Sequence, residues 1–316
     1  MRKKLLRYSA LLLVIGFTIS CQVKKGLTPR EGFVDVKGGK VWYKIVGDGN
    51  QTPIIFLHGG PGVPSYYLNP LAELGNDRPV VFFDQLGCGR SQQEMDSSLM
   101  TVESFVDQLE DLRLALGIED FYLYGSSWGT MLGMDYYLKY PKHVNAIIFS
   151  SPCLSAKRWT ADADTLIQTL PDSIQLAIRT NSKNGTYTTP DYLHAVETYA
   201  KNFVVRNQTP DVDSSVARAN SALYNYMWGP SEFTALGTLK DYDRTNELSK
   251  IKVPTLFIAG EFDEARPNTV KFYQGLVKGS SFEMMRNSGH LTMQDNPQQD
   301  ITAIRNFLTA VEQKHN

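Results

Sequence analysis

The segment Gly125-Ser126-Ser127-Trp128-Gly129 constrains the fold of this chain more than any other. It lies between 121–124, a short apolar run typical of a buried strand, and 130–140, which has the pattern of a helix. A strand that turns this sharply into a helix presents its central residue on a tight elbow, with the side chain exposed above the sheet. Glycines are needed around the turn because backbone segments come too close there for a Cβ atom. The two glycines frame Ser127, not Ser126, as a candidate nucleophile.

A second loop follows another apolar run, 54–57, which predicts a buried strand. Its sequence is His58-Gly59-Gly60-Pro61-Gly62, so two residues without side chains leave backbone amides free to approach a developing oxyanion. The residue after a serine nucleophile supplies the other amide of such a site. We therefore expect the 58–62 loop and the amide of Trp128 to form an oxyanion hole.

A serine nucleophile needs a base, and elimination among the five histidines favours His290. It lies in a turn rich in serine and glycine, directly after the strand-like run 282–285. The other four lie in the glycine loop, after a helix-ending proline, in a polar helical stretch and in the C-terminal tail: His58, His143, His194 and His315.

The base must be oriented by a carboxylate, which in this chain order precedes the histidine. The apolar run 255–260 predicts a strand, and the loop Glu261-Phe262-Asp263-Glu264 follows it. Three carboxylates compete in this loop. Spacing alone leaves Glu261, Asp263 and Glu264 open.

Strands and helices alternate along most of the chain. Apolar runs predict strands at 34–36, 41–46, 54–57, 80–83, 121–124, 146–149, 255–259 and 282–285. Helices are predicted at 101–116, 130–140, 267–276 and 298–311. This order predicts an α/β fold whose mostly parallel sheet is covered on both faces, with hairpin-like strands at its beginning.

The strand pattern disappears between about 155 and 242, where the chain is polar, helix-prone and rich in aromatic residues. We predict that 154–242 forms a helical lid over the carboxyl edge of the sheet. The core then consists of 29–153 and 243–316. A small helical core accounts for most of the lid aromatics.

Composition agrees with an enzyme of ordinary size. The 316 residues, 42% hydrophobic with a net charge of -1, suit one large core with an insertion or two domains. The balanced charge gives no reason to expect a nucleic-acid partner. Cys88 and Cys153 lie far apart in the sequence, and we expect both to be free thiols.

The N-terminus has the pattern of an export signal. Basic residues precede the apolar run 10–17, which is too short to span a membrane comfortably. Cys21 follows a small residue and resembles the cleavage site of a bacterial lipoprotein, so 1–21 is predicted to end at a lipidated cysteine. The protein would then be anchored by lipid in the cell envelope, on the periplasmic or outer-surface side. Plain secretion with cleavage near Cys21 is the alternative.

Four motifs together resemble the proline iminopeptidase family, the α/β-hydrolase branch of serine aminopeptidases. They cover the chain from about Glu31 onward and are the 58–62 loop, Asp84-Gln85-Leu86-Gly87-Cys88-Gly89-Arg90-Ser91, the 125–129 elbow, and the pair formed by 261–264 and 288–291. The resemblance implies an α/β-hydrolase fold with an inserted lid and no cofactor or metal. It implies a triad and an oxyanion hole formed by Ser127, Asp263, His290 and the amides of Gly60 and Trp128.

The segment 228–243 is similar to the tricorn-interacting aminopeptidase of this family. The resemblance implies that Glu232 and Glu264 bind the free α-amino group of a short peptide whose N-terminal residue is proline or another apolar residue. Two carboxylates facing a desolvated ammonium supply charge-assisted hydrogen bonds. They exclude longer chains in which further residues precede this position, because the nitrogen is then an uncharged amide. Another hydrolase on the same scaffold, acting on small esters, lactones or amino-acid amides, needs the same triad and is the alternative.

Overall fold

The computed structural model describes residues 26–314, and these are built around one eight-stranded sheet. Its spatial order is β1-β2-β4-β3-β5-β6-β7-β8. The strands are β1 (Arg30–Val36), β2 (Gly39–Val46), β3 (Ile54–Leu57), β4 (Val80–Phe83), β5 (Phe121–Ser126), β6 (Val144–Ser150), β7 (Thr255–Gly260) and β8 (Ser281–Met285). All eight strands predicted from apolar runs are confirmed.

The sheet is mixed, as the early strands suggested. β1 pairs antiparallel with β2, β2 pairs antiparallel with β4, and every pair from β4 to β8 is parallel. The central strands β3, β4 and β5 are buried along their whole length because helices cover both faces of the sheet. The carboxyl ends of parallel strands meet at one edge, and this brings the loops after β3, β5, β7 and β8 together.

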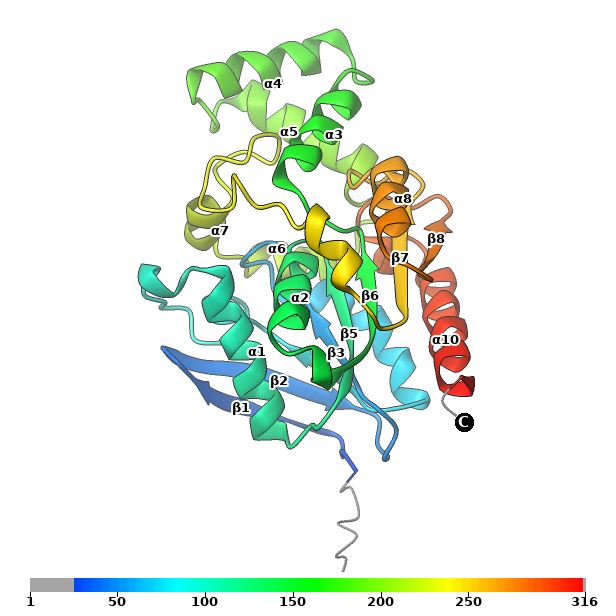
Figure 1. Cartoon of the computed structure of the whole chain (residues 1–316). Coiled ribbons are helices and arrows are strands. Elements are labelled where there is room, and N and C mark those ends of the chain that lie inside the picture. Colours follow the sequence, from blue (N-terminus) through cyan, green and yellow to red (C-terminus); the bar gives the residue numbers. More distant parts are fainter. Residues whose placement is uncertain (1–25, 315–316) are drawn as a thin grey trace, which may run out of the picture.

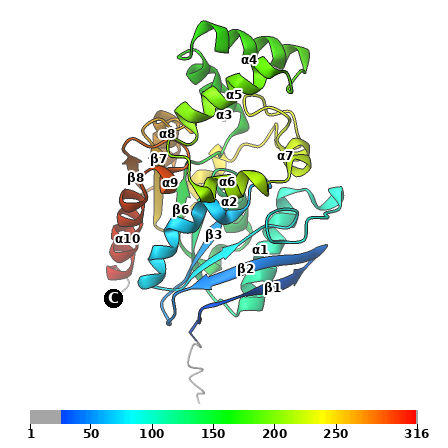
Figure 2. The same cartoon turned by 180° about the vertical axis from the view of Figure 1, so that it is seen from behind.

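Helices cover the two faces in separate layers. On one face lie α1 (Val102–Leu116), α2 (Trp128–Lys139) and α8 (Pro267–Leu276), as Figure 1 shows. On the other lie the 3₁₀ segment η1 (Ser65–Asn76), α9 (Thr292–Asp295) and α10 (Pro297–Gln313), seen in Figure 2. The four helices expected from sequence are present, whereas η1 was not predicted. Short 3₁₀ turns complete the core: η2 (Ser97–Leu99), η3 (Pro141–His143) and η4 (Thr245–Lys250).

Five helices lie between β6 and β7, in the region predicted as the lid. They are α3 (Ala156–Ile167), α4 (Asp172–Asn184), α5 (Pro190–Phe203), α6 (Pro210–Ala217) and α7 (Ser221–Met227). α3, α4 and α5 rise beyond the edge of the sheet at the top of Figure 1. Some lid aromatics form a separate small core, among them Tyr192, Tyr199 and Phe233. Others, including Trp159 and Trp228, pack with the main core instead.

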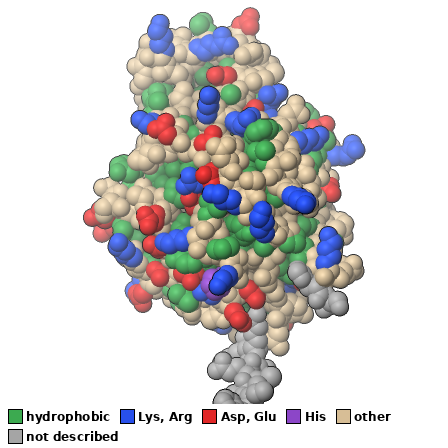
Figure 3. Space-filling model, in the orientation of Figure 1, with side chains coloured by type: hydrophobic (Ala, Val, Ile, Leu, Met, Phe, Trp, Pro, Cys, Tyr) green, Lys and Arg blue, Asp and Glu red, His purple; other side chains and the backbone are tan. Residues whose placement is uncertain are grey.

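Within residues 26–314, no helix is long and apolar enough to cross a membrane. On the face shown in Figure 3, acidic and basic side chains are interspersed with apolar ones. Cys88 and Cys153 are buried free thiols, as expected. The predicted signal segment and Cys21 lie outside the described residues.

Candidate active site

Ser127 lies on a strained turn between β5 and α2. Its φ of 56° and ψ of -123° are unusual for a residue with a side chain. The flanking glycines are sterically required: a Cβ on Gly125 would lie 2.5 Å from the carbonyl oxygen of Gly129, and one on Gly129 would lie 2.1 Å from that of Leu57. The local sequence therefore folds into the elbow that its glycine spacing predicted.

The loops after β7 and β8 bring Asp263 against His290. Oδ1 of Asp263 lies 2.8 Å from Nδ1 of His290, and both side chains are almost fully buried. Glu264 is farther from the imidazole, with Oε1 at 3.9 Å from Nδ1. Glu261 is exposed and accepts a hydrogen bond from the amide of Asn287. Of the three carboxylates left open by spacing, the geometry favours Asp263 as the orienting acid.

Ser151, at the end of β6, is a residue that the sequence did not single out. Its hydroxyl lies 2.6 Å from Oδ2 of Asp263 and 2.8 Å from the carbonyl oxygen of His290. The amides of Gly260 and Ala265 also donate to the Asp263 carboxylate. Several hydrogen bonds to one carboxylate fix its orientation. Asp263 is thus held rigidly with one oxygen directed at the imidazole.

The expected oxyanion loop packs directly against the elbow. A Cβ on Gly59 would lie 3.0 Å from the Cβ of Ser127, and Gly60 has a φ of 109°. The amide of Trp128 belongs to the first turn of α2, where backbone N–H groups have no partner within the helix. Gly60 and Trp128 both line a pocket with Ser127, so the two residues expected to supply the oxyanion amides lie beside the candidate nucleophile.

Two side chains brace this loop. Gln85 accepts a hydrogen bond from the Trp128 indole (2.9 Å) and donates one to the carbonyl oxygen of His58 (3.1 Å). The hydroxyl of Tyr67 accepts a hydrogen bond from the amide of Gly59 (2.7 Å). Gln85 therefore links the two segments that supply the oxyanion amides. Its position in the 84–91 motif was visible in the sequence, but its partners were not.

Arg90 of the same motif has a structural environment. It donates to both carboxylate oxygens of buried Asp84, and its guanidinium lies over the rings of Trp42 and Tyr66, 3.4 and 3.9 Å from their centroids. Burial lowers the pKa of His58, whose Nε2 accepts a hydrogen bond from the amide of Gln85. These residues hold the loops and do not face the pocket around Ser127.

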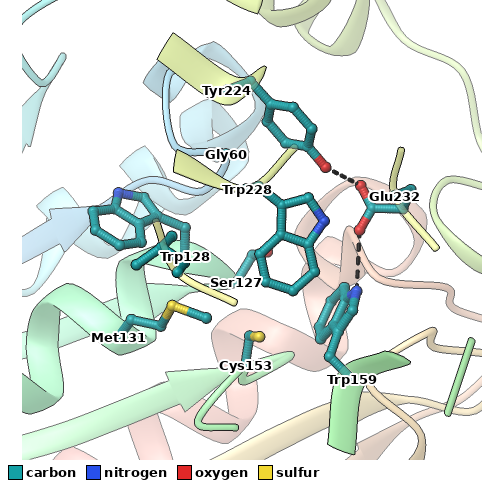
Figure 4. Close-up of a pocket in the computed structure, with 10 residues that line it drawn as sticks. Gly60, Ser127, Trp128, Met131, Cys153, Trp159, Tyr224, Trp228 and Glu232 are labelled. Atoms are coloured by element: carbon teal, nitrogen blue, oxygen red, sulfur yellow. Dashed lines mark hydrogen bonds between the residues drawn. The ribbon is translucent and has the colours of Figure 1, made fainter. Parts of the chain in front are cut away.

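Glu232 is fixed by two aromatic donors from the lid. The indole of Trp159 donates to Oε1 (3.1 Å), and the hydroxyl of Tyr224 donates to Oε2, as Figure 4 shows. Both donors were visible in the sequence only as members of an aromatic-rich region. They direct a partly buried carboxylate toward the space above Ser127.

Glu264 is the second carboxylate of this region, and it is almost completely buried at 4% exposure. Among the described residues, its Oε2 has no hydrogen-bond partner. Burial raises the pKa of Glu264 well above its ordinary value, and the neighbouring Glu232 and Asp263 carboxylates raise it further. The side chain of Tyr199 acts in the opposite direction and lowers this pKa. A buried carboxylate oxygen that lacks a hydrogen-bond partner carries a free-energy penalty, which a bound cation would relieve.

Ser127 lies at the junction of two cavities. The first, which we call the tryptophan pocket, has about 250 Å³ of empty space and is closed by large apolar side chains. Its walls include Trp128, Met131, Cys153, Trp159, Trp228 and Leu239. An apolar group of small volume, attached to a carbonyl carbon at Ser127, suits this pocket.

The second, which we call the valine cavity, is larger, with about 970 Å³ of empty space. It shares Gly60, Ser127, Tyr224 and Glu232 with the tryptophan pocket. It is also lined by Glu264 and His290 and by apolar residues that include Val63, Val204, Val205, Val212, Val216 and Leu291. The two candidate amine-binding carboxylates therefore face one cavity, as the sequence resemblance implied.

The end of α5 is hydrogen-bonded to the catalytic loops. The carbonyl oxygen of Phe203 accepts from the amides of His290 (2.9 Å) and Glu264 (3.3 Å), and that of Val204 accepts from the amide of Leu291 (2.9 Å). We call these three bonds the α5 clasp. Through them the lid and the two loops form one continuous hydrogen-bonded unit.

Residues 52–297 match the model of the alpha/beta hydrolase fold family. The proline iminopeptidase of Heyndrickxia coagulans is 41% identical to this chain over 285 residues, which are 89% of this chain and 99% of that protein. This chain belongs to the proline iminopeptidase family. The crystal structure of the family member from Mycobacterium smegmatis superposes with a TM-score of 0.84 at 30% identity, covering 91% of this chain and 100% of that one. The crystal structure of VinJ superposes with a TM-score of 0.85 at 30% identity, covering 90% of this chain and 100% of that one.

The family membership and the α/β-hydrolase fold inferred from the four motifs are thereby confirmed. The residues that the family resemblance implies line one or both of the two cavities that meet at Ser127, except Asp263, which lies behind His290. Ser151, Gln85, Trp159 and Tyr224 are additional members of the site. Ser151, Gln85 and Trp159 contact their partners across long stretches of sequence, so no local pattern could have revealed them. Tyr224 lies only eight residues from Glu232, but the sequence showed it simply as one of many lid aromatics.

Proposed function

We propose that this chain is a serine aminopeptidase that releases an N-terminal proline or another apolar residue from short peptides. Membership of the proline iminopeptidase family and the grouping of Ser127, Asp263 and His290 support this activity. The small apolar tryptophan pocket supports the preference for the first residue. The similarity of 228–243 to the tricorn-interacting aminopeptidase supports an amine-binding role for Glu232.

The reaction would begin with attack of Ser127 Oγ on the scissile carbonyl. His290 takes the serine proton as the new C–O bond forms, while Asp263 holds the imidazole in the required tautomer. The carbonyl oxygen becomes an oxyanion, which accepts hydrogen bonds from the amides of Gly60 and Trp128. Removing one such donor in serine hydrolases costs on the order of 10²–10³-fold in kcat.

The tetrahedral intermediate then collapses to an acyl-enzyme. His290 gives its proton to the departing nitrogen, the C–N bond breaks, and the remainder of the peptide leaves as an amine. Water next attacks the ester carbonyl with His290 again accepting the proton. His290 then returns this proton to Ser127 Oγ as the ester C–O bond breaks, which releases the free N-terminal amino acid and regenerates Ser127.

One observation carries the assignment as an aminopeptidase rather than an esterase: Glu232 and Glu264 both border the cavity that contains Ser127 and His290. An ester or lactone hydrolase has no use for two carboxylates beside its nucleophile. A peptide N-terminus has a pKa of ~8 and is largely protonated at neutral pH. Glu232, fixed by Trp159 and Tyr224, and Glu264, which lacks a partner at Oε2 among the described residues, together form a site for that cation.

The decisive experiment compares Glu232→Gln with wild type on three substrates: prolyl p-nitroanilide, its N-acetylated form and p-nitrophenyl acetate. We expect the variant to lose roughly 10- to 1000-fold in kcat/KM on the free amine, since breaking a buried charge pair costs about 3–5 kcal/mol and a partly open pocket costs less. The neutral ester should be hydrolysed about as fast as by wild type, and the acetylated substrate should be poor for both enzymes.

The matched control is Glu261→Gln, which removes an exposed carboxylate from the loop that carries Glu264. It should leave all three rates close to wild type. Equal losses of Glu232→Gln on charged and neutral substrates would show that Glu232 supports structure, and the esterase alternative would gain.

We also propose that the mature protein is a lipoprotein of the cell envelope, anchored through Cys21. The basic start, the short apolar run 10–17 and the small residue before Cys21 support this location. A tethered aminopeptidase would act on peptides outside the cytoplasm.

A further inference from the structure

The two cavities that meet at Ser127 differ in one catalytic residue. His290 lines the valine cavity but not the tryptophan pocket. The tryptophan pocket instead contains the side chain of Trp128, whose amide is one of the two expected oxyanion donors. The substrate carbonyl therefore has a histidine side and an indole side.

The chemistry assigns one part of the substrate to each side. When the tetrahedral intermediate collapses, His290 must reach the nitrogen that departs, because it supplies the proton. The leaving amine consequently lies in the valine cavity, and the acyl group lies in the tryptophan pocket. Glu232 borders both cavities and can hold the α-amino group at their junction.

We infer that the valine cavity is a leaving-group site that selects an uncharged, apolar residue directly after the scissile bond. This inference rests on the proposed aminopeptidase function and specifies its substrates. The wall is built by Val63 from the oxyanion loop, Val204 and Val205 after α5, and Val212 and Val216 from α6. Such a wall stabilises apolar side chains by removing them from water.

Two polar side chains of the wall form hydrogen bonds within the protein. The hydroxyl of Ser215 bonds the amide of Tyr67 (2.9 Å) and the carbonyl oxygen of Pro64 (3.0 Å). The side chain of Gln208 donates to Asp213 (2.7 Å). These groups are less available to compensate a polar side chain of the substrate for its lost hydration.

The charge of the cavity discriminates as well. Among the described residues, its only acidic side chains are Glu232 and Glu264, and no lysine or arginine lines it. A free C-terminal carboxylate or an acidic side chain next to the scissile bond would lie in a cavity with two acidic side chains and no lysine or arginine to pair with. Amides, and peptides that continue beyond the cavity, should therefore be better substrates than free dipeptides.

The test is a panel of Pro-X-NH₂ substrates with Leu, Gly, Asn or Asp at X, together with Pro-Leu as the free acid and prolinamide. We expect kcat/KM for Leu to exceed that for Gly by about 10- to 100-fold, the range given by small changes of apolar size in a hydrophobic pocket. Asp should fall at least about tenfold below its near-isostere Asn, and the free acid should fall similarly below Pro-Leu-NH₂, because like charges repel in a poorly solvated site.

Val212→Thr tests the wall itself, because it keeps the shape of a nearly buried side chain and adds a hydroxyl. The ratio of kcat/KM for Pro-Leu-NH₂ to kcat/KM for Pro-Gly-NH₂ should fall about threefold or more in this variant. Val196→Thr is the matched control, since Val196 packs against the separate lid core and does not line the cavity. In Val196→Thr the same ratio of kcat/KM values should equal that of wild type.

The panel separates this inference from the function beneath it. If prolinamide is cleaved but Pro-X-NH₂ substrates with Leu, Gly and Asp react at equal rates, the leaving-group assignment is overturned and the aminopeptidase function stands. Faster cleavage of Pro-Leu as the free acid than of Pro-Leu-NH₂ would have the same meaning. Failure to cleave prolinamide and every dipeptide amide would overturn the aminopeptidase itself.

Discussion

The hydroxyl of Ser151 lies 2.6 Å from Oδ2 of Asp263, on the side of the carboxylate opposite the catalytic imidazole. Ser151 adopts a φ of 50°, which is rare for a residue with a side chain. The same hydroxyl also lies 2.8 Å from the carbonyl oxygen of His290. Ser151 thus connects the acid to the backbone of the base, and its strained conformation is maintained by these contacts.

Asp263→Asn should lower kcat on the order of 10⁴-fold, because an amide at this position favours the wrong imidazole tautomer. Ser151→Ala should lower kcat about tenfold with little change in KM, since it removes one hydrogen bond that orients the acid. Steady-state kinetics with prolyl p-nitroanilide measure both effects. A Glu264→Gln enzyme that is crippled on neutral esters while Asp263→Asn is not would show that Glu264 is the true acid.

Ser127→Ala should cost on the order of 10⁴-fold or more in kcat while leaving the fold intact, because members of a triad act as a unit. Ser126→Ala is the matched control: its side chain is buried in β5, next to the nucleophile in sequence. It should cost much less. The thermal unfolding curves of both variants check the fold, and the opposite order of activities would mean that the elbow has been misassigned.

Glu264→Gln should raise the stability of the ligand-free protein at neutral pH by about 1–2 kcal/mol, at the expense of activity on free amines. The pKa of Glu264 is raised in the folded state, so folding favours its protonated form. The wild type is therefore most stable below the unfolded pKa of 4.5 and loses stability as pH rises through the higher folded pKa. Denaturant unfolding at several pH values should show the two proteins converging in acid and separating as pH increases.

The selectivity for a free amine should itself depend on pH. The useful quantity is the ratio of kcat/KM for prolyl p-nitroanilide to that for p-nitrophenyl acetate, because titration of the triad cancels in it. As pH rises through the elevated pKa of Glu264, the carboxylate ionises and the ratio should increase. Above about pH 8 the substrate ammonium loses its proton and the ratio should fall again. In Glu264→Gln the rising limb should disappear; a rising limb that persists would assign it to another group.

The lipoprotein proposal predicts that the wild type partitions with membranes and incorporates labelled palmitate. Cys21→Ala should block lipid attachment and correct processing. Because one acyl chain anchors only marginally, firm attachment requires more than one chain on the mature N-terminus. Recovery of unlipidated, soluble wild-type protein from cells would contradict the proposal.

Local patterns in the sequence were enough to predict the sheet and the nucleophile. Runs such as 54–57 are buried on both faces, and the glycines around Ser127 respond to contacts within the turn itself. By contrast, η1 was not predicted, and it contains Pro70, a residue that ordinarily interrupts a helix. Its residues are ordered by packing against the sheet and α10, which the local sequence does not encode.

Site residues whose contacts lie within a few positions in the sequence could be predicted, whereas those that contact distant segments could not. Choosing Asp263 over its neighbours needed family resemblance, because all three carboxylates of the loop follow the same strand. The roles of Ser151 and Gln85 depend on single side-chain hydrogen bonds between distant segments, and neither residue type is unusual at the end of a strand. Such contacts arise only once the sheet order has placed the segments together.

The α5 clasp has a consequence for the order of events in a catalytic cycle. Because the carbonyl oxygens of Phe203 and Val204 are bonded to the very loops that bear Glu264 and His290, lifting the end of α5 would release the amine-binding carboxylate and the base together. With the end of α5 lifted, the protein would be unable to cleave a peptide bond. Cleavage would require the end of α5 to be in contact with the two loops. A substrate that entered by lifting the end of α5 could therefore be cleaved only after the three hydrogen bonds had formed again.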